Sequence, residues 1–135
     1  MMDKRIMETK KPSNVLKYTF LISGSVALVF GLIFMLMTEF YLSLLGWTSI
    51  YDPFFPRVLG AALLGFWLLQ WLSSREMEWK RVKNIVIVMI YWHAMGCVAS
   101  LLSQFAFNLP VTNWMHTTVF LIFLIAYIYC YYKER

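Results

Sequence analysis

Long apolar stretches recur along this chain, and short polar stretches separate them. Four of them are close to the roughly 20 residues that a helix needs to cross the hydrocarbon core of a bilayer. They are residues 19–37, 53–72, 85–105 and 114–132. A helix satisfies its own backbone hydrogen bonds in lipid, and short connections bring successive helices side by side. We therefore expect an all-α, polytopic membrane protein that forms an antiparallel bundle of four transmembrane helices.

The segments between the spans are too short for an independent soluble domain. Residues 1–135 are therefore interpreted as a single four-helix transmembrane domain, which begins with an extramembrane segment over residues 1–17. The first apolar run is longer than the roughly 7–15 apolar residues of a secretory signal, and no small-residue cleavage site follows it. We expect it to be a retained span.

Composition supports a lipid environment. Hydrophobic residues make up 61% of the chain and charged residues only 14%, whereas a soluble domain has about 45–50% and 25%. Two Cys residues are too few for a disulfide scaffold. Neither a nucleotide-binding fingerprint nor a hydrolase or metalloprotease motif occurs. An ordinary hydrolase, nucleotide enzyme or dehydrogenase is therefore not expected.

The basic residues predict an orientation, because cationic loops resist translocation. Of 12 Lys and Arg residues, Arg57 alone flanks the two loops that the opposite side would carry. Both termini are therefore expected in the cytoplasm and the protein in the cytoplasmic membrane, as a multi-pass protein. The net charge of +5 is split over three short segments, which argues against a nucleic-acid partner. The lipid bilayer is the partner that this pattern indicates.

Local signals refine the connections between the spans. The apolar segment 39–47 is suited to the membrane interface, and Gly46 is a candidate C-cap for a short helix there. Asp52 followed by Pro53 is typical of a helix start. Thr112 or Asn113 is a candidate cap for the last span.

Small residues recur at spacings that allow helices to pack closely in lipid. They are Ser23, Ala27 and Gly31 in the first span, Gly60, Ala61 and Gly65 in the second, and Gly96 and Ser100 in the third. The pattern suits contacts within the bundle, and it equally suits the seam of a homodimer or of a complex with other membrane subunits.

The third span carries a polar face. His93, Cys97, Ser100 and Gln104 follow one another at helical spacing. Two interpretations are open: these groups hydrogen-bond to neighbouring helices, or they line a pocket for a small ligand or water. A metal bound by His93 and Cys97 would lack further ligands, so no metal is expected.

Arg57 is the remaining charged candidate. Glu39 and Asp52 lie near it in the predicted topology. A cluster of these residues would either hold the first two spans together or capture an anionic ligand or lipid.

His116 is expected near the edge of the membrane, in a polar cluster with Asn113 and Thr117, with ligand contact as the alternative. At about 1.5 Å of rise per residue, His93 and His116 differ in depth by about 12–15 Å. A haem held between these two histidines is therefore not expected, and no cofactor is predicted.

The segment D-P-F-F-P-R-V-L-G-A-A-L-L-G, residues 52–65, resembles the second-helix signature of small prokaryotic four-helix membrane proteins of the DoxX-like families. The match covers one helix and its preceding loop. The resemblance implies a compact four-helix bundle with an accessory role in the membrane more than a defined reaction.

Three hypotheses follow. The first is a non-enzymatic accessory or assembly partner in the cytoplasmic membrane. The second is a binder or carrier of a small hydrophobic or weakly polar ligand, in a pocket lined by the polar face of the third span and opening near Arg57 and His116. The third is a quinone-interacting subunit of a membrane oxidoreductase.

Overall fold

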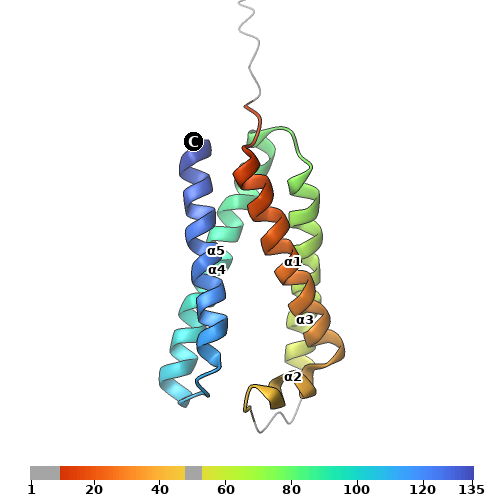
Figure 1. Ribbon diagram of the computed structural model, residues 1–135, viewed down its shortest axis with the longest axis vertical. Helices are drawn as coiled ribbons and strands as arrows, with labels where there is room; N and C mark the ends of the chain where they lie inside the picture. The colour runs from red at the N-terminus through yellow and green to blue at the C-terminus, as the bar shows by residue number, and fades with distance from the viewer. Residues whose placement is uncertain (1–9, 48–52) are drawn as a thin grey trace, which may run out of the picture.

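Five α-helices make up the chain in the computed structural model, which describes residues 10–47 and 53–135 (Figure 1). The four long helices are α1 (Asn14–Leu36), α3 (Phe54–Ser74), α4 (Trp79–Phe107) and α5 (Asn113–Glu134), and a short helix, α2 (Thr38–Leu44), follows α1. No strand occurs within these two described ranges. The prediction of an all-α fold is confirmed.

Each long helix contains an apolar window that is long enough to cross a membrane. Only 11–33% of the residues in each window are buried inside the protein. Most of the apolar surface therefore faces outward, as lipid contact requires and water would oppose. Four candidate membrane spans are thus confirmed by length and composition.

The helices extend beyond the apolar runs that predicted them. α4 begins at Trp79 rather than at residue 85, and α1 begins at Asn14 rather than at residue 19. The added segments contain Lys17 in α1 and Lys80, Arg81 and Lys83 in α4, which are good helix formers. At α1, the Ser13 hydroxyl accepts a hydrogen bond of 3.3 Å from the Leu16 N–H and caps the helix. Asp52, the expected cap of the second span, lies outside the described residues.

α2 ends in a left-handed turn at Gly46, which has φ +80°. The Gly46 N–H donates to the Ser43 carbonyl at 3.0 Å, and the Trp47 N–H donates to the Leu42 carbonyl at 3.0 Å. This pair of bonds is a Schellman motif, which satisfies carbonyls left open at the helix end. The expectation that Gly46 caps a short helix is confirmed.

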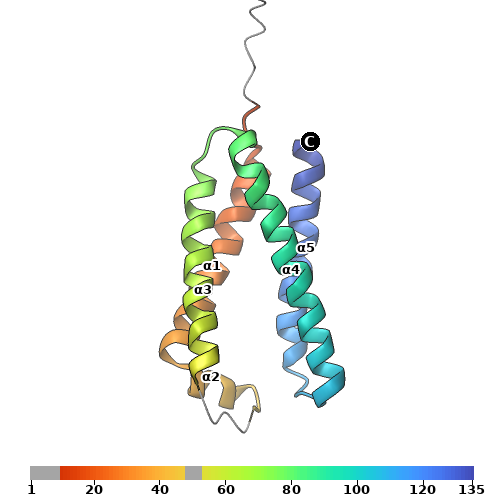
Figure 2. The ribbon, with the colours of Figure 1, turned by 180° about the vertical axis from the view of Figure 1, so that it is seen from behind.

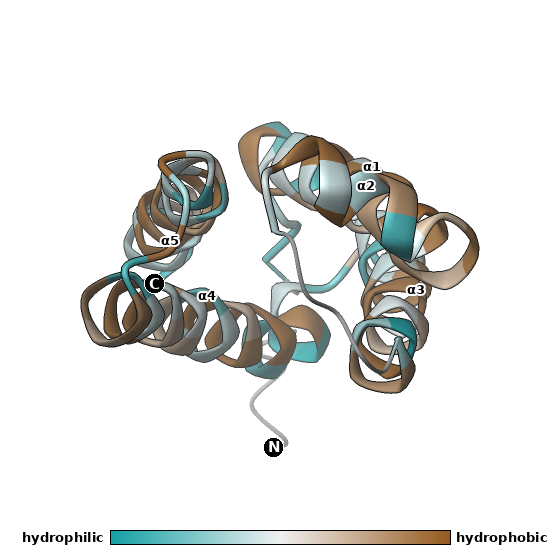
Figure 3. Ribbon diagram, turned by 90° about the horizontal axis from the view of Figure 1, so that it is seen from below, coloured by the Kyte–Doolittle hydropathy of each residue, from teal (hydrophilic) through white to brown (hydrophobic). Residues whose placement is uncertain are grey.

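The long helices form two pairs rather than one evenly packed group. α1 packs along α3, and α4 packs along α5. Figures 1 and 2 show the pairs close together at the end that carries both chain termini and apart at the end that carries α2. We call these the terminal end and the α2 end. Figure 3 looks at the protein from the α2 end and shows the four long helices mostly in apolar colours.

The α1–α3 pair is held close by glycines. A Cβ on Gly60 would lie 2.9 Å from the Gly31 carbonyl oxygen, so the two backbones touch at this point. Gly65 also belongs to the small-residue pattern, but a Cβ added there would have no neighbouring atom within 4 Å. Small residues at regular spacing therefore include both packed and open positions, because spacing does not specify the direction of the neighbouring helix.

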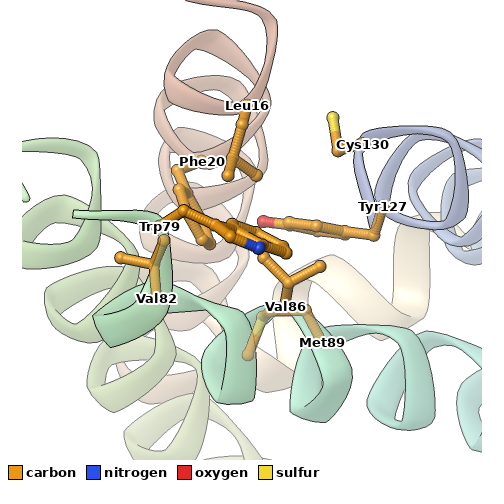
Figure 4. Close-up of a cluster of buried hydrophobic side chains, with 8 residues drawn as sticks. All are labelled: Leu16, Phe20, Trp79, Val82, Val86, Met89, Tyr127 and Cys130. Carbon is orange, nitrogen blue, oxygen red and sulfur yellow. The ribbon is translucent and has the colours of Figure 1, made fainter. Parts of the chain in front are cut away.

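A hydrophobic core lies at the terminal end (Figure 4). It consists of Leu16 and Phe20 from α1, Trp79, Val82, Val86 and Met89 from α4, and Tyr127 and Cys130 from α5. Beside it, the segment just before α1 contacts the end of α5, because Lys10 Nζ donates to the Glu134 carbonyl at 2.6 Å. This core joins the two helix pairs at one end and leaves them separate at the other.

Candidate functional site

A cavity of about 680 Å³ lies between the two helix pairs. Side chains from all five helices line it, and Trp47, just after α2, adds to the lining. Its walls are mainly apolar and include aromatic rings from four helices: Phe30 and Phe34 from α1, Phe55 from α3, Trp92 from α4, and Phe120 and Phe123 from α5. The volume falls within the roughly 300–1,000 Å³ of small-molecule sites, which are also mostly apolar.

The floor of the cavity is a buried hydrogen bond between the pairs. Tyr127 Oη donates to Gln70 Oε1 at 2.6 Å, and the two residues are 0% and 2% exposed. Gln70 Nε2 donates in turn to the Phe66 carbonyl at 3.2 Å. Ser23, from α1, lies beside the Tyr127 side chain. Three helices thus contribute to one polar cluster directly above the hydrophobic core.

The sequence analysis did not identify Gln70 or Tyr127. A lone Gln in a span of Leu, Trp and Gly is itself a signal, because an amide in lipid needs a hydrogen-bond partner. Gln is not ionisable, so it does not stand out among charged candidates. Tyr127 lies close to three other tyrosines that suit the membrane interface, and this proximity hid its buried position.

His93 lies beside this floor and lines the cavity. Its Nδ1 is 2.6 Å from the Met89 carbonyl oxygen, one turn back in α4. Its ring packs against Tyr127, with centroids 5.5 Å apart, and against Phe123 at 5.6 Å. The imidazole is therefore held by its own helix and by α5.

The predicted polar face of α4 divides into two parts. Ser100 lines the cavity as His93 does, whereas Cys97 and Gln104 are not among its lining residues. His93 and Ser100 therefore face the cavity, and Ser100 also hydrogen-bonds to α5.

At the α2 end of this polar face, hydrogen bonds join α4 to α5. Ser100 Oγ and Thr117 Oγ1 are 2.5 Å apart. Asn113 Nδ2 donates to Gln104 Oε1 at 3.0 Å, and Gln104 Nε2 donates to the Leu109 carbonyl at 2.8 Å. Gln104 is therefore a packing residue.

His116 lines the cavity near α2 and has a different partner from the one expected. Its Nε2 is 3.0 Å from Tyr41 Oη, whereas the hydrogen bonds of Asn113 and Thr117 go to α4 and to the α5 backbone. The expected cluster of His116 with these two residues is therefore wrong. The prediction relied on residues adjacent in one helix, whereas the partner of His116, Tyr41, comes from α2.

α2 lies across the α2 end of the cavity and is anchored to α5. The Thr112 hydroxyl donates to the Leu45 carbonyl at 2.6 Å, so it bonds to the end of α2 instead of capping its own helix. Burial raises the pKa of the Tyr41 phenol, which keeps this hydroxyl protonated beside His116. Two hydrogen bonds therefore connect the α1–α3 pair to α5 at this end.

Arg57 lies outside the cavity lining. Its Nη2 is 3.0 Å from Glu39 Oε1, so one of its two predicted partners is present; Asp52 lies outside the described residues. The two side chains are 49% and 56% exposed. An ion pair this open to solvent contributes little, about 0–1 kcal/mol. It connects α2 to the start of α3 at the surface.

Within residues 10–47 and 53–135, no three His, Cys, Asp or Glu side chains gather where they could hold a metal ion. The chemistry available in the cavity is hydrogen bonding by neutral groups. Comparisons of this chain with protein-family models, with curated proteins and with solved structures find no match.

Proposed function

We propose that this chain crosses a bilayer four times and binds a small, largely apolar molecule in the cavity between its two helix pairs. The cavity itself carries the proposal. The helices separate around about 680 Å³ of space whose walls are mainly apolar and whose floor is polar. Empty space loses the dispersion contacts that close packing would give. A bundle with only a packing role would be expected to close it.

The proposal includes an orientation. The terminal end carries the basic residues Lys10, Lys11, Lys17, Arg75, Lys80, Arg81, Lys83, Lys133 and Arg135. The positive-inside rule supports an antiparallel bundle with this end in the cytoplasm of a prokaryotic cell. The cavity then lies in the outer half of the cytoplasmic membrane, where an apolar molecule dissolved in lipid would reach it.

A second candidate function is that of an accessory subunit, as the resemblance to DoxX-like proteins implies. One observation favours it: Ala61, Ala62 and Gly65 are exposed on α3, and Gly65 has open space beside it. Small residues on an outward face permit close approach of another helix in lipid. A partner subunit or a second copy of the chain would pack here, away from the cavity.

Photolabelling with benzophenone tests the binding proposal. Benzophenone is apolar and inserts into nearby C–H bonds on illumination. In the full chain reconstituted in lipid nanodiscs, we expect labelling of cavity residues such as Trp92 and Phe120, located by mass spectrometry of peptides. The labelling should saturate with probe concentration.

A matched pair of variants sharpens this test. Ala99 lines the cavity, whereas Ala61 is exposed and outside it. Ala99→Phe should fill the cavity and reduce saturable labelling at least about tenfold, as expected for loss of roughly 1.4 kcal/mol of binding. Ala61→Phe adds the same side chain to the outward face and should leave labelling unchanged. Equal labelling of both variants would overturn the proposal.

A further inference from the structure

The geometry of His93 points to the chemical class of the ligand, and this inference rests on the proposed binding function. His93 is 6% exposed and lines the cavity beside its polar floor. Its Nδ1 lies 2.6 Å from the Met89 carbonyl oxygen. A carbonyl oxygen only accepts hydrogen bonds, so Nδ1 must carry the proton.

This hydrogen bond determines the character of the other ring nitrogen. In a neutral imidazole one nitrogen donates and the other accepts. A charged imidazolium is costly within the hydrocarbon region, so the neutral form is the relevant one. With the proton on Nδ1, Nε2 presents a lone pair. The Met89 carbonyl therefore makes His93 Nε2 a hydrogen-bond acceptor.

Nε2 has no hydrogen-bond partner in the described part of the chain. Trp47 Nε1 is the one fully buried side-chain nitrogen or oxygen found there without a partner. His93 Nε2 also lacks a partner but is not fully buried, so part of its surface remains accessible. The His93 ring packs against aromatic rings of α5, and the residue also lines the cavity.

The neighbouring polar groups on the floor are already engaged. Gln70 accepts from the Tyr127 hydroxyl and donates to the Phe66 carbonyl. Nε2 is therefore the acceptor that this part of the cavity leaves open for a ligand.

The charge of the lining residues narrows the chemical class of the ligand further. Neither an acidic nor a basic side chain of Asp, Glu, Lys or Arg is found among the described residues that line the cavity. A charged ligand would lose its hydration without gaining a counter-charge. A ligand that ends in a carbonyl or ether would place an oxygen lone pair against the lone pair of Nε2.

We infer that the cavity selects a neutral apolar molecule with a hydroxyl group, an alcohol or a phenol, whose O–H donates to His93 Nε2. The apolar body of the ligand lies against the aromatic walls. The hydroxyl lies at the floor, beside Tyr127.

Two benzophenones that differ in one donor test this selectivity. 4-Hydroxybenzophenone carries an O–H, and 4-methoxybenzophenone carries an ether oxygen at the same position. Both are used at pH 6, where the phenol is neutral, with the full chain in nanodiscs. One net hydrogen bond predicts half-saturating labelling at a roughly 2- to 10-fold lower concentration for the hydroxy compound.

Variants assign the preference to His93. His93→Phe keeps a ring of similar size against Tyr127 and removes the acceptor, so the two compounds should label it equally. Cys97→Ala changes a polar side chain of the same helix outside the cavity lining and should retain the preference. If His93→Phe does not fold, the ratio of the two compounds on the unsubstituted chain still decides.

The outcomes separate the two levels of the proposal. Saturable cavity labelling with equal half-saturation by both compounds on the unsubstituted chain would overturn the selectivity and leave the binding function intact. A preference retained in a folded His93→Phe would also overturn it. Absence of saturable cavity labelling by benzophenone itself would overturn the binding function.

Discussion

Tyr127 Oη donates a 2.6 Å hydrogen bond to Gln70 Oε1, and neither residue is more than 2% exposed. Tyr127 belongs to α5 and Gln70 to α3, so this bond joins the two helix pairs. It lies where the core of the terminal end gives way to the cavity. The position of the bond sets where the pairs stop packing and begin to separate.

Removal of this bond should destabilise the protein measurably. Tyr127→Phe leaves Gln70 Oε1 without its donor, and Gln70→Leu leaves the Tyr127 hydroxyl without its acceptor. Hydrogen bonds between helices in membranes couple by about 0.6 kcal/mol on average and up to about 1.7. We expect a coupling energy near the upper value, because both groups are fully buried. A double-mutant cycle of unfolding in mixed detergent and SDS measures it, and a coupling near zero would contradict the assignment.

Gly60 and Gly65 lie on the same helix and should respond in opposite ways to alanine. A Cβ at residue 60 would lie 2.9 Å from the Gly31 oxygen and 2.9 Å from the Met35 nitrogen, both backbone atoms that cannot rotate away. Gly60→Ala should therefore force α1 and α3 apart and cost about 1–3 kcal/mol. Gly65→Ala meets nothing within 4 Å and should be neutral or stabilising by up to about 1 kcal/mol. The same SDS titration compares the two, and equal effects would contradict the close crossing.

The sequence predicted the number and nature of the helices well, because crossing a bilayer imposes length and apolarity on each segment separately. It predicted the capping at Gly46 for a similar reason: the left-handed turn depends on neighbours in the chain. Both properties are local. Neither depends on where another helix lies.

Contacts between helices were harder to predict. In lipid the outward face of a helix is as apolar as its inward face, so hydrophobicity does not indicate which side packs. The polar face that begins at His93 was predicted, yet which of its residues line the cavity and which bond to α5 depends on where the other helices lie. The partner of His116 is Tyr41, which is 75 residues away in the chain. No spacing rule could have joined them.

Glu134 connects the last turn of α5 to the first turn of α1. Its Oε1 accepts a hydrogen bond of 2.8 Å from the Ser13 N–H, and the residue is 2% exposed. Glu134→Ala should cost about 1–3 kcal/mol, because it leaves a donor of the α1 N-terminus without a partner. Glu134→Gln retains an acceptor oxygen and should cost less than half as much. If both substitutions prove equally costly, charge rather than the hydrogen bond would be responsible.

Tyr41 should stabilise the position of α2 across the cavity. Its hydroxyl lies 3.0 Å from His116 Nε2, and Tyr41→Phe removes this link between α2 and α5. We expect a loss of about 0.5–1.5 kcal/mol. Ser43→Ala is the matched control, since Ser43 Oγ donates only to the Phe40 carbonyl of its own helix and is exposed. It should leave the free energy of unfolding unchanged in the same titration.

The contribution of Tyr41 to the free energy of unfolding should also depend on pH. The burial of its phenol sets the direction of this dependence. Burial raises the pKa of the Tyr41 phenol above its ordinary value of 10.0, so the folded protein holds this proton more tightly than the unfolded chain does. The stabilisation is therefore fully present below about pH 10 and is lost as the pH rises through the folded pKa. The difference in unfolding free energy between the unsubstituted chain and Tyr41→Phe should be constant from about pH 7 to 9 and should shrink above about pH 10. A difference that grows above pH 10 would mean that the phenolate is the form stabilised beside His116, contrary to the effect of burial.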